Sequence, residues 1–147
     1  MLDNKSFHTF VKEKEIKEME KTIPINTNKR KFFRQYVEIL QPLFKIRARE
    51  ADVLAALLYE SYLRRDIGDI RDRFKLVYDY DIKMKIREEL KMSSSVFCNC
   101  MVRLRKKGIL GKDDIIRPGF LINPIEEETI DIKFSFKFIK DAEEGKR

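Results

Sequence analysis

From residue 29 to residue 108 the apolar residues recur every three or four positions, which is the spacing of one face of an α-helix. The pattern predicts helices over residues 29–46, 47–65, 81–92 and 93–108, and Pro42 predicts that the first helix stops near it. The apolar stripes expected to be buried are Phe33, Tyr36, Val37 and Leu40 in the first helix, Ala51, Leu54, Ala55, Leu58 and Tyr62 in the second, Ile82, Ile86 and Leu90 in the third, and Val96, Phe97, Cys100, Met101 and Leu104 in the fourth. The core is therefore expected to be built mainly from helices.

The ends of these helices carry sequence signals of their own. Asp81 is a candidate N-cap for the third helix, and Ser93 or Ser94 for the fourth, because their side-chain oxygens can accept hydrogen bonds from free backbone N–H groups. Gly108 follows the fourth helix and predicts its end. Residues 66–82 alternate acidic and basic side chains and predict a turn followed by a short helix or an extended insertion.

Beyond Gly108 the pattern changes from helical to extended. Residues 117–120, Arg-Pro-Gly-Phe, have the signature of a type II turn, and the apolar pairs at 115–116 and 121–122 predict short flanking strands. Residues 128–140 alternate, with Ile130, Ile132, Phe134, Phe136 and Phe138 on one side and Asp131, Lys133, Ser135 and Lys137 on the other. This alternation predicts a long, half-buried strand.

The two ends of the chain differ from its central part. Residues 1–21 predict a charged helix with a thin apolar edge, and residues 22–28 contain Pro and two Asn, which break it. The expected organisation is a charged N-terminal arm at 1–28, one domain at 29–124, and a C-terminal strand with a polar tail at 125–147.

The composition is that of a globular protein rather than a membrane or secreted one. Hydrophobic residues make up 43% and charged residues 39% of the chain, and no apolar run approaches the roughly 18 residues of a membrane span. The first residues are charged throughout, unlike a signal peptide, so a cytoplasmic location is expected. Cys98 and Cys100 suit a reducing interior and would point about 160° apart on a helix. With His8 as the only histidine, no metal site is predicted.

Positive charge is concentrated in the middle of the chain. The net charge of the whole chain is +7, but residues 29–107 contain twenty basic and eleven acidic residues, which gives this part a net charge of +9. The densest basic groups lie at 29–34 and 103–107. Such a distribution favours an anionic partner.

The order of helices, turn and extended segments resembles that of a winged helix-turn-helix domain over about residues 47–124. Three stretches carry the resemblance: READVLAALL, IREELKMSSSVFCNCMVRLRKKGIL and IIRPGFLINP. The junction LRKKGIL is similar to that of MarR-type regulators, and GFLINP is similar to the wing of phage and plasmid replication initiators. The resemblance implies a mostly helical domain with a small β-hairpin wing. Together with the extra C-terminal strand that the alternation at 128–140 predicts, the expected fold class is α+β. Two features depart from a winged helix-turn-helix domain, an insertion at 66–80 and a turn, Lys91-Met92-Ser93, that lacks the usual glycine.

In such a domain the helix at 94–107 would enter the major groove of DNA. On a helical wheel Ser95 and Asn99 fall opposite the apolar stripe, and an Asn can form two hydrogen bonds with adenine. Cations later in the helix are better placed for phosphates. The candidate DNA-binding residues are Ser94, Ser95, Asn99, Val102, Arg103, Arg105, Lys106 and Lys107 in this helix, Lys112 and Arg117 in the wing, and Lys29, Arg30 and Lys31 near the start of the domain. The same cations could instead serve only to complement the dipole of the helix.

The leading hypothesis is a DNA-binding protein, a transcriptional regulator or replication-initiation factor of phage or plasmid type. Its expected partners are double-stranded DNA and further copies of itself, as a homodimer or larger assembly, and no membrane is involved. The alternative is a structural or adaptor subunit of a phage particle, then located in the virion, or of another multi-subunit assembly. In that case the arm and the strand at 128–140 would dock onto neighbouring subunits.

No enzymatic chemistry is predicted. The sequence offers no nucleophile paired with a base, no glycine-rich phosphate loop and no histidine pair, so neither an enzyme nor a cofactor is expected. Asp66, Asp69 and Asp72 could line one helical face and hold Mg²⁺. The arginines among them favour a salt-bridged, solvated surface instead.

Overall fold

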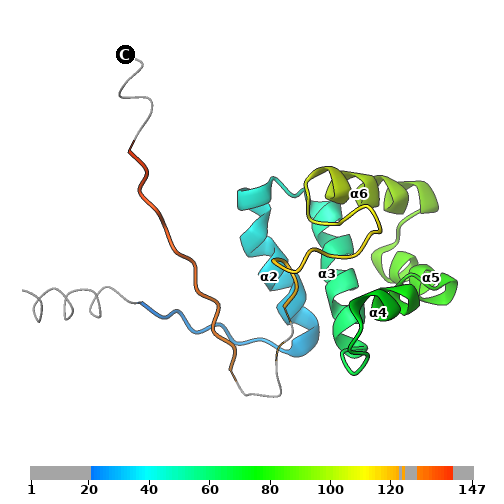
Figure 1. Cartoon of the computed structure of the whole chain (residues 1–147), viewed down its shortest axis with the longest axis horizontal. Coiled ribbons are helices and arrows are strands. Elements are labelled where there is room, and N and C mark those ends of the chain that lie inside the picture. The colour runs from blue at the N-terminus through cyan, green and yellow to red at the C-terminus, as the bar shows by residue number, and fades with distance from the viewer. Residues whose placement is uncertain (1–20, 123, 125–128, 141–147) are drawn as a thin grey trace, which may run out of the picture.

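The computed structural model describes residues 21–122, 124 and 129–140 of the chain. These residues form five α-helices: α2 (Lys29–Phe44), α3 (Ala48–Leu63), α4 (Ile70–Val77), α5 (Tyr80–Leu90) and α6 (Ser94–Lys106) (Figure 1). Helix α3 is central, because the other four helices all pack against it. Its residues Val53, Leu54 and Leu57 are fully buried as a result. None of the helices in the described part of the chain is long and apolar enough to cross a membrane.

The helical periodicity predicted the core well. Every residue of the stripes expected in α2 and α3 is buried, and so are Phe97, Cys100, Met101 and Leu104 of α6. Val96 is an exception, 37% exposed in the first turn of α6, and of the stripe expected in α5 only Ile86 is buried, while Ile82 and Leu90 are partly buried. The short helix considered for the insertion is α4, and Asp79 rather than Asp81 precedes α5. The helix expected at 1–21 and the polar tail lie outside the described residues, apart from Lys21.

The expected α+β fold is wrong. The described residues contain no strand, only one isolated antiparallel bridge between Leu110 and Ile116, and so neither the β-hairpin wing nor the additional strand is present among them. A turn does form at residues 117–120, closed by a 2.9 Å hydrogen bond from the Phe120 N–H to the Arg117 carbonyl. It is not of type II, because Gly119 lacks the positive φ that this type requires.

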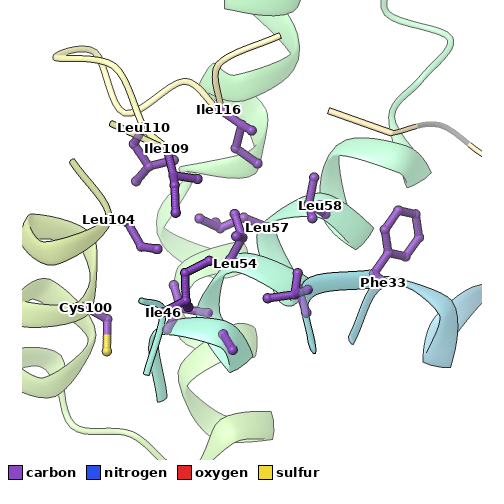
Figure 2. Close-up of a cluster of buried hydrophobic side chains, with 14 of the residues drawn as sticks. Phe33, Ile46, Leu54, Leu57, Leu58, Cys100, Leu104, Ile109, Leu110 and Ile116 are labelled. Atoms are coloured by element: carbon purple, nitrogen blue, oxygen red, sulfur yellow. The ribbon is translucent and has the colours of Figure 1, made fainter. Parts of the chain in front are cut away.

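Apolar residues of the junction after α6 and of the first strand expected in the wing close the helical core instead. Ile109, Leu110 and Ile116 are fully buried, and Figure 2 shows them converging with Leu104 of α6 and Leu57 of α3. The following segment lies against α2. There the Tyr36 hydroxyl donates a 3.2 Å hydrogen bond to the Phe120 carbonyl, and the rings of Phe44 and Phe120 meet edge to face at 4.9 Å. Burial against helices therefore outweighs strand pairing in this part of the chain.

Residues 129–140 are extended but belong to no sheet (Figure 1). The predicted half-buried strand is wrong here because a strand needs a neighbour to bond with, and none is present among the described residues. Only Ile132 is partly buried against the core. Phe136 is 84% and Phe138 99% exposed.

Three helices end in the same left-handed turn. After α6, Gly108 has φ +75°, the Ile109 N–H bonds to the Leu104 carbonyl and the Gly108 N–H bonds to the Arg105 carbonyl, which together form a Schellman motif. Helix α5 ends in the same way, with Lys91 (φ 53°) in the position that glycine usually occupies, and α2 ends at Lys45 (φ 55°). The missing glycine between α5 and α6 is thus replaced by a lysine held in the left-handed conformation.

Candidate nucleic-acid interface

Helix α6 has one buried face and one exposed face. The buried face packs on α3. The exposed side chains are Ser94, Ser95, Val96, Cys98, Asn99, Val102, Arg103, Arg105 and Lys106, which we call the α6 face. No acidic residue occurs in this helix. The α6 face is therefore polar and uncharged in its N-terminal half and basic in its C-terminal half.

The start of α6 is set by the serines that precede it. The Ser93 hydroxyl caps the helix by accepting a hydrogen bond from the Val96 N–H at 3.2 Å, and it lies 3.2 Å from the Ser95 hydroxyl. Of the two candidate N-caps, Ser93 is the one used. Only residues 91–93 separate α5 from α6, so the two helices follow each other as one α5–turn–α6 unit.

The first turn of α3 fixes the beginning of this unit. Arg49 donates hydrogen bonds to the carbonyls of Leu90 (3.1 Å) and Lys91 (3.3 Å), which are the last carbonyl of α5 and the first carbonyl of the turn that follows. A guanidinium can satisfy two carbonyls at once because its N–H groups form a rigid fork. Arg49 therefore holds the α5–α6 turn against α3.

The neighbouring residue, Glu50, fixes the other end of α6. Its fully buried carboxylate accepts hydrogen bonds from the Arg47 N–H (3.1 Å) and from the ammonium group of Lys107. Lys107 also donates a 2.7 Å hydrogen bond to the Lys45 carbonyl. Lys107, a candidate phosphate contact, is thus engaged inside the fold.

Arg105 is likewise engaged, although it is exposed. Its guanidinium forms an ion pair with Asp114, in the loop that follows α6. The Tyr78 hydroxyl donates a 2.6 Å hydrogen bond to the Asp114 carbonyl and so ties the loop to the end of α4. Burial raises the pKa of Tyr78 well above its usual 10.0, and the Asp114 carboxylate raises it further. The loop therefore lies beside the basic half of α6 and neutralises one of its cations.

In α6 and the loop after it, the other four predicted cations form no ion pair within the described residues and are exposed: Arg103, Lys106, Lys112 and Arg117. Lys112 is in the loop that Asp114 joins to α6, and the N–H of Arg117 bonds to the carbonyl of Ile109, just after the helix. These four cations therefore gather around the C-terminal end of α6. The exposed carboxylate of Asp113 lies in the same loop.

The basic group at the start of α2 lies elsewhere. Lys29 lies over the ring of Tyr62, and Arg30 lies over the ring of Tyr59 and 3.6 Å from Glu89. Lys31 is exposed. This end of α2 is separated from Lys45, which touches Lys107, by about 20 Å of helix. Lys29, Arg30 and Lys31 thus lie at the other end of α2 from the contact with the C-terminal, basic end of α6.

Two further candidates have structural roles. Asp69 caps α4 by accepting hydrogen bonds from the Arg71 and Asp72 N–H groups (2.8 and 3.3 Å), so Asp66 and Asp69 precede the helix instead of lining it. Cys98 is exposed and Cys100 is buried, on opposite sides of α6 as the helical wheel predicted. Burial raises the pKa of Cys100 above its usual 9.0.

The sequence did not reveal the residues that hold α6 in place. Arg49 and Glu50 are adjacent charged residues at the start of a helix, which is an ordinary position for solvated side chains. The one signal in the sequence was Glu50 three residues after Arg47, a spacing at which a glutamate can cap the first turn. Comparisons of the chain with protein-family models, curated proteins and solved structures found no match.

Proposed function

We propose that this chain binds double-stranded DNA through the α6 face, as a transcriptional regulator or replication-initiation factor does. The observation that carries the proposal is the division of that face. Ser95 and Asn99 are exposed in its N-terminal half, Arg103 and Lys106 are exposed in its C-terminal half, and no acid interrupts it. A hydrogen-bonding region beside a basic region matches the two needs of DNA recognition, base contact and phosphate contact.

The dimensions of the helix support this proposal. An α-helix with its side chains is roughly 10–12 Å across, and the major groove of B-DNA is about 12 Å wide. With the N-terminal half of α6 in the groove, Ser95 and Asn99 would meet base edges, and Val102 could contact a thymine methyl group. Arg103 and Lys106 would lie toward the phosphates. Arg49 and Glu50 keep α6 at a fixed position on α3, which supports a rigid recognition helix.

The decisive experiment is titration of fluorescently labelled duplexes at low and raised salt concentration, read by anisotropy. We expect binding that weakens steeply with salt, because each neutralised phosphate releases counterions. Lys106→Ala should weaken binding and lower the salt slope by about one unit. Lys75→Ala is the matched control, since this exposed lysine of α4 carries the same charge away from α6. Absence of binding at low salt, or equal effects of the two substitutions, would contradict the proposal.

A second candidate function is that of a structural or adaptor subunit in a larger assembly, such as a phage particle. It is favoured by residues 129–140, because their exposed apolar side chains are typical of a segment that docks onto another protein. Size-exclusion chromatography with light scattering distinguishes the two functions. A ring or other large oligomer that does not bind DNA would favour the assembly subunit.

A further inference from the structure

The segment at residues 129–140, TIDIKFSFKFIK, presents both an apolar face and free backbone. It is extended, and its residues form no hydrogen bond or ion pair with one another or with other described residues. Four side chains are conspicuously exposed, namely Phe134 (42%), Phe136 (84%), Phe138 (99%) and Ile139 (88%). Free N–H and C=O groups beside apolar side chains form a template for pairing with another extended chain.

We propose that this segment pairs with the same segment of a second copy of the chain, antiparallel and centred on Phe134. In that register Phe134 faces its own counterpart, Ile132 faces Phe136 and Ile130 faces Phe138, so that the five apolar side chains from Ile130 to Phe138 fall on one face, whereas Ile139 falls on the other face, opposite Thr129. On the other face Asp131 of each copy lies opposite Lys137 of its partner. Lys133 lies opposite Ser135, so no like charges are paired.

The neighbouring registers are less favourable because of the same charges. Shifting the partner by two residues in one direction places Lys133 opposite Lys133, and shifting it by two in the other places Lys133 opposite Lys137. A shift of one residue places apolar side chains opposite polar ones. Parallel, in-register pairing sets each charge against itself. The sequence therefore selects both the partner, a second copy, and the alignment.

This dimer goes beyond the proposed DNA binding and does not depend on it. Within the described residues only Ile132 of the segment packs partly against the core, and α6 packs on α3. Pairing through residues 130–138 would leave the α6 face of each copy exposed. A pair of such faces would suit two half-sites on a duplex.

A charge-swap series tests the register. Sedimentation of the full chain should show a reversible dimer. Asp131→Lys and Lys137→Asp should each weaken it about tenfold or more, because two-fold symmetry makes each substitution create two like-charge pairs. The double variant, with the two charges exchanged, should restore dimerisation. Lys133→Asp is the matched control and should not weaken the dimer, since its partner is Ser135.

Cysteine cross-linking tests the centre of the pairing in a Cys98→Ser background. Phe134→Cys should form a disulfide-linked dimer on oxidation, and Phe136→Cys alone should not. A mixture of Ile132→Cys and Phe136→Cys chains should cross-link with each other. A chain that remains monomeric at every concentration, or a charge swap that fails to restore the dimer, would overturn the proposal. The first of these outcomes would assign the segment to a different partner protein.

Discussion

Lys107, at the end of α6, forms an ion pair with Glu50, which lies fifty-seven residues earlier in the first turn of α3. The pair is asymmetric, because the Glu50 side chain is almost completely buried and that of Lys107 is partly exposed. Lys107 also reaches the carbonyl of Lys45, so a single ammonium group joins α6, α3 and the end of α2. The position of the proposed recognition helix thus depends on one buried carboxylate.

We expect Lys107→Met to destabilise the fold by about 3 kcal/mol, at the low end of the range for a broken buried ion pair. The substitution leaves the Glu50 carboxylate buried without its cation. Glu50→Gln should cost less, because Lys107 can then turn toward solvent and the amide oxygen can still accept from the Arg47 N–H. Urea denaturation measures both effects.

Lys106→Met is the control for this pair, since it removes the neighbouring cation from an exposed position. It should change the free energy of unfolding by less than about 0.5 kcal/mol. Equal effects of Lys106→Met and Lys107→Met would show that the buried pair does not stabilise the fold.

We expect substitutions of the left-handed residues at two helix ends to have opposite effects on the stability of the chain. Gly108→Ala should destabilise the chain by about 1 kcal/mol, because alanine is strained at φ +75° although the space around it is open. Lys91→Gly should stabilise it by a smaller amount, since glycine adopts φ 53° without strain but gains entropy in the unfolded chain. Thermal unfolding of both variants provides the comparison. Gly68→Ala, where φ is not positive and no atom lies within 4 Å of the added Cβ, should not be destabilising.

The helices could be predicted from sequence because a helix completes its hydrogen bonds within its own segment and needs only a stripe of apolar residues to pack. The structure of the residues that follow α6 could not be predicted in this way. Their alternation correctly indicates an extended chain at 129–140, but it does not say whether a neighbouring strand exists. The Pro118-Gly119 turn forms, yet Ile109 and Ile116 are used to cover the helical core. Pairing of strands depends on distant residues, and local pattern carries no information about them.

Prediction from local sequence pattern has the same limit at the candidate site, where it does not give the contacts of single residues. A helical wheel predicted that Ser95, Asn99 and Lys106 face outward, and the structure confirms it. The wheel places Lys107, about 100° further round than Lys106, on the side of the apolar stripe, but it could not predict that Lys107 bonds to Glu50. That contact depends on an acid in another helix. Long-range ion pairs of this kind cannot be deduced from local spacing.

Alkaline pH should destabilise the chain through groups whose pKa values are raised in the folded state. Burial raises the pKa values of Tyr78 and Cys100 above their usual 10.0 and 9.0. A raised folded pKa means that the folded chain holds its protons more tightly than the unfolded chain. The resulting stability is complete below the unfolded pKa and is lost as pH rises past it, so the decline should begin near pH 9.

Tyr78→Phe isolates the contribution of Tyr78 from those of Cys100 and of Tyr36, whose pKa values burial also raises. At neutral pH it should cost about 1 kcal/mol, because the hydrogen bond to the Asp114 carbonyl is lost. Above pH 10 its stability should fall less steeply with pH than that of the unmodified chain. Tyr80→Phe is the control at an exposed tyrosine. Parallel pH profiles for Tyr78→Phe and the unmodified chain, from denaturation at each pH, would refute the assignment.

Asn99→Ala separates recognition from stability on the α6 face. Because Asn99 is exposed, its loss should change the free energy of unfolding by less than about 0.5 kcal/mol. If it reads a base, the preference for selected over random duplexes should fall by about 1–3 kcal/mol at that base pair. Binding selections with both chains measure the preference. A lower melting temperature with unchanged preference would instead give Asn99 a structural role.

Asp114→Asn should strengthen DNA binding. It removes the carboxylate that pairs with Arg105 while keeping a residue type that tolerates the left-handed φ of 62° at this position. With Arg105 free to reach a phosphate, we expect affinity at low salt to rise about threefold and the salt slope to steepen by about one unit. Asp113→Asn is the matched control, since it removes the same charge from the same loop without releasing Arg105. Anisotropy titrations at several salt concentrations compare the two variants. Equal gains in affinity would mean that net charge alone governs binding. A gain confined to Asp114→Asn would identify Arg105 as a phosphate contact that Asp114 neutralises in the unmodified chain.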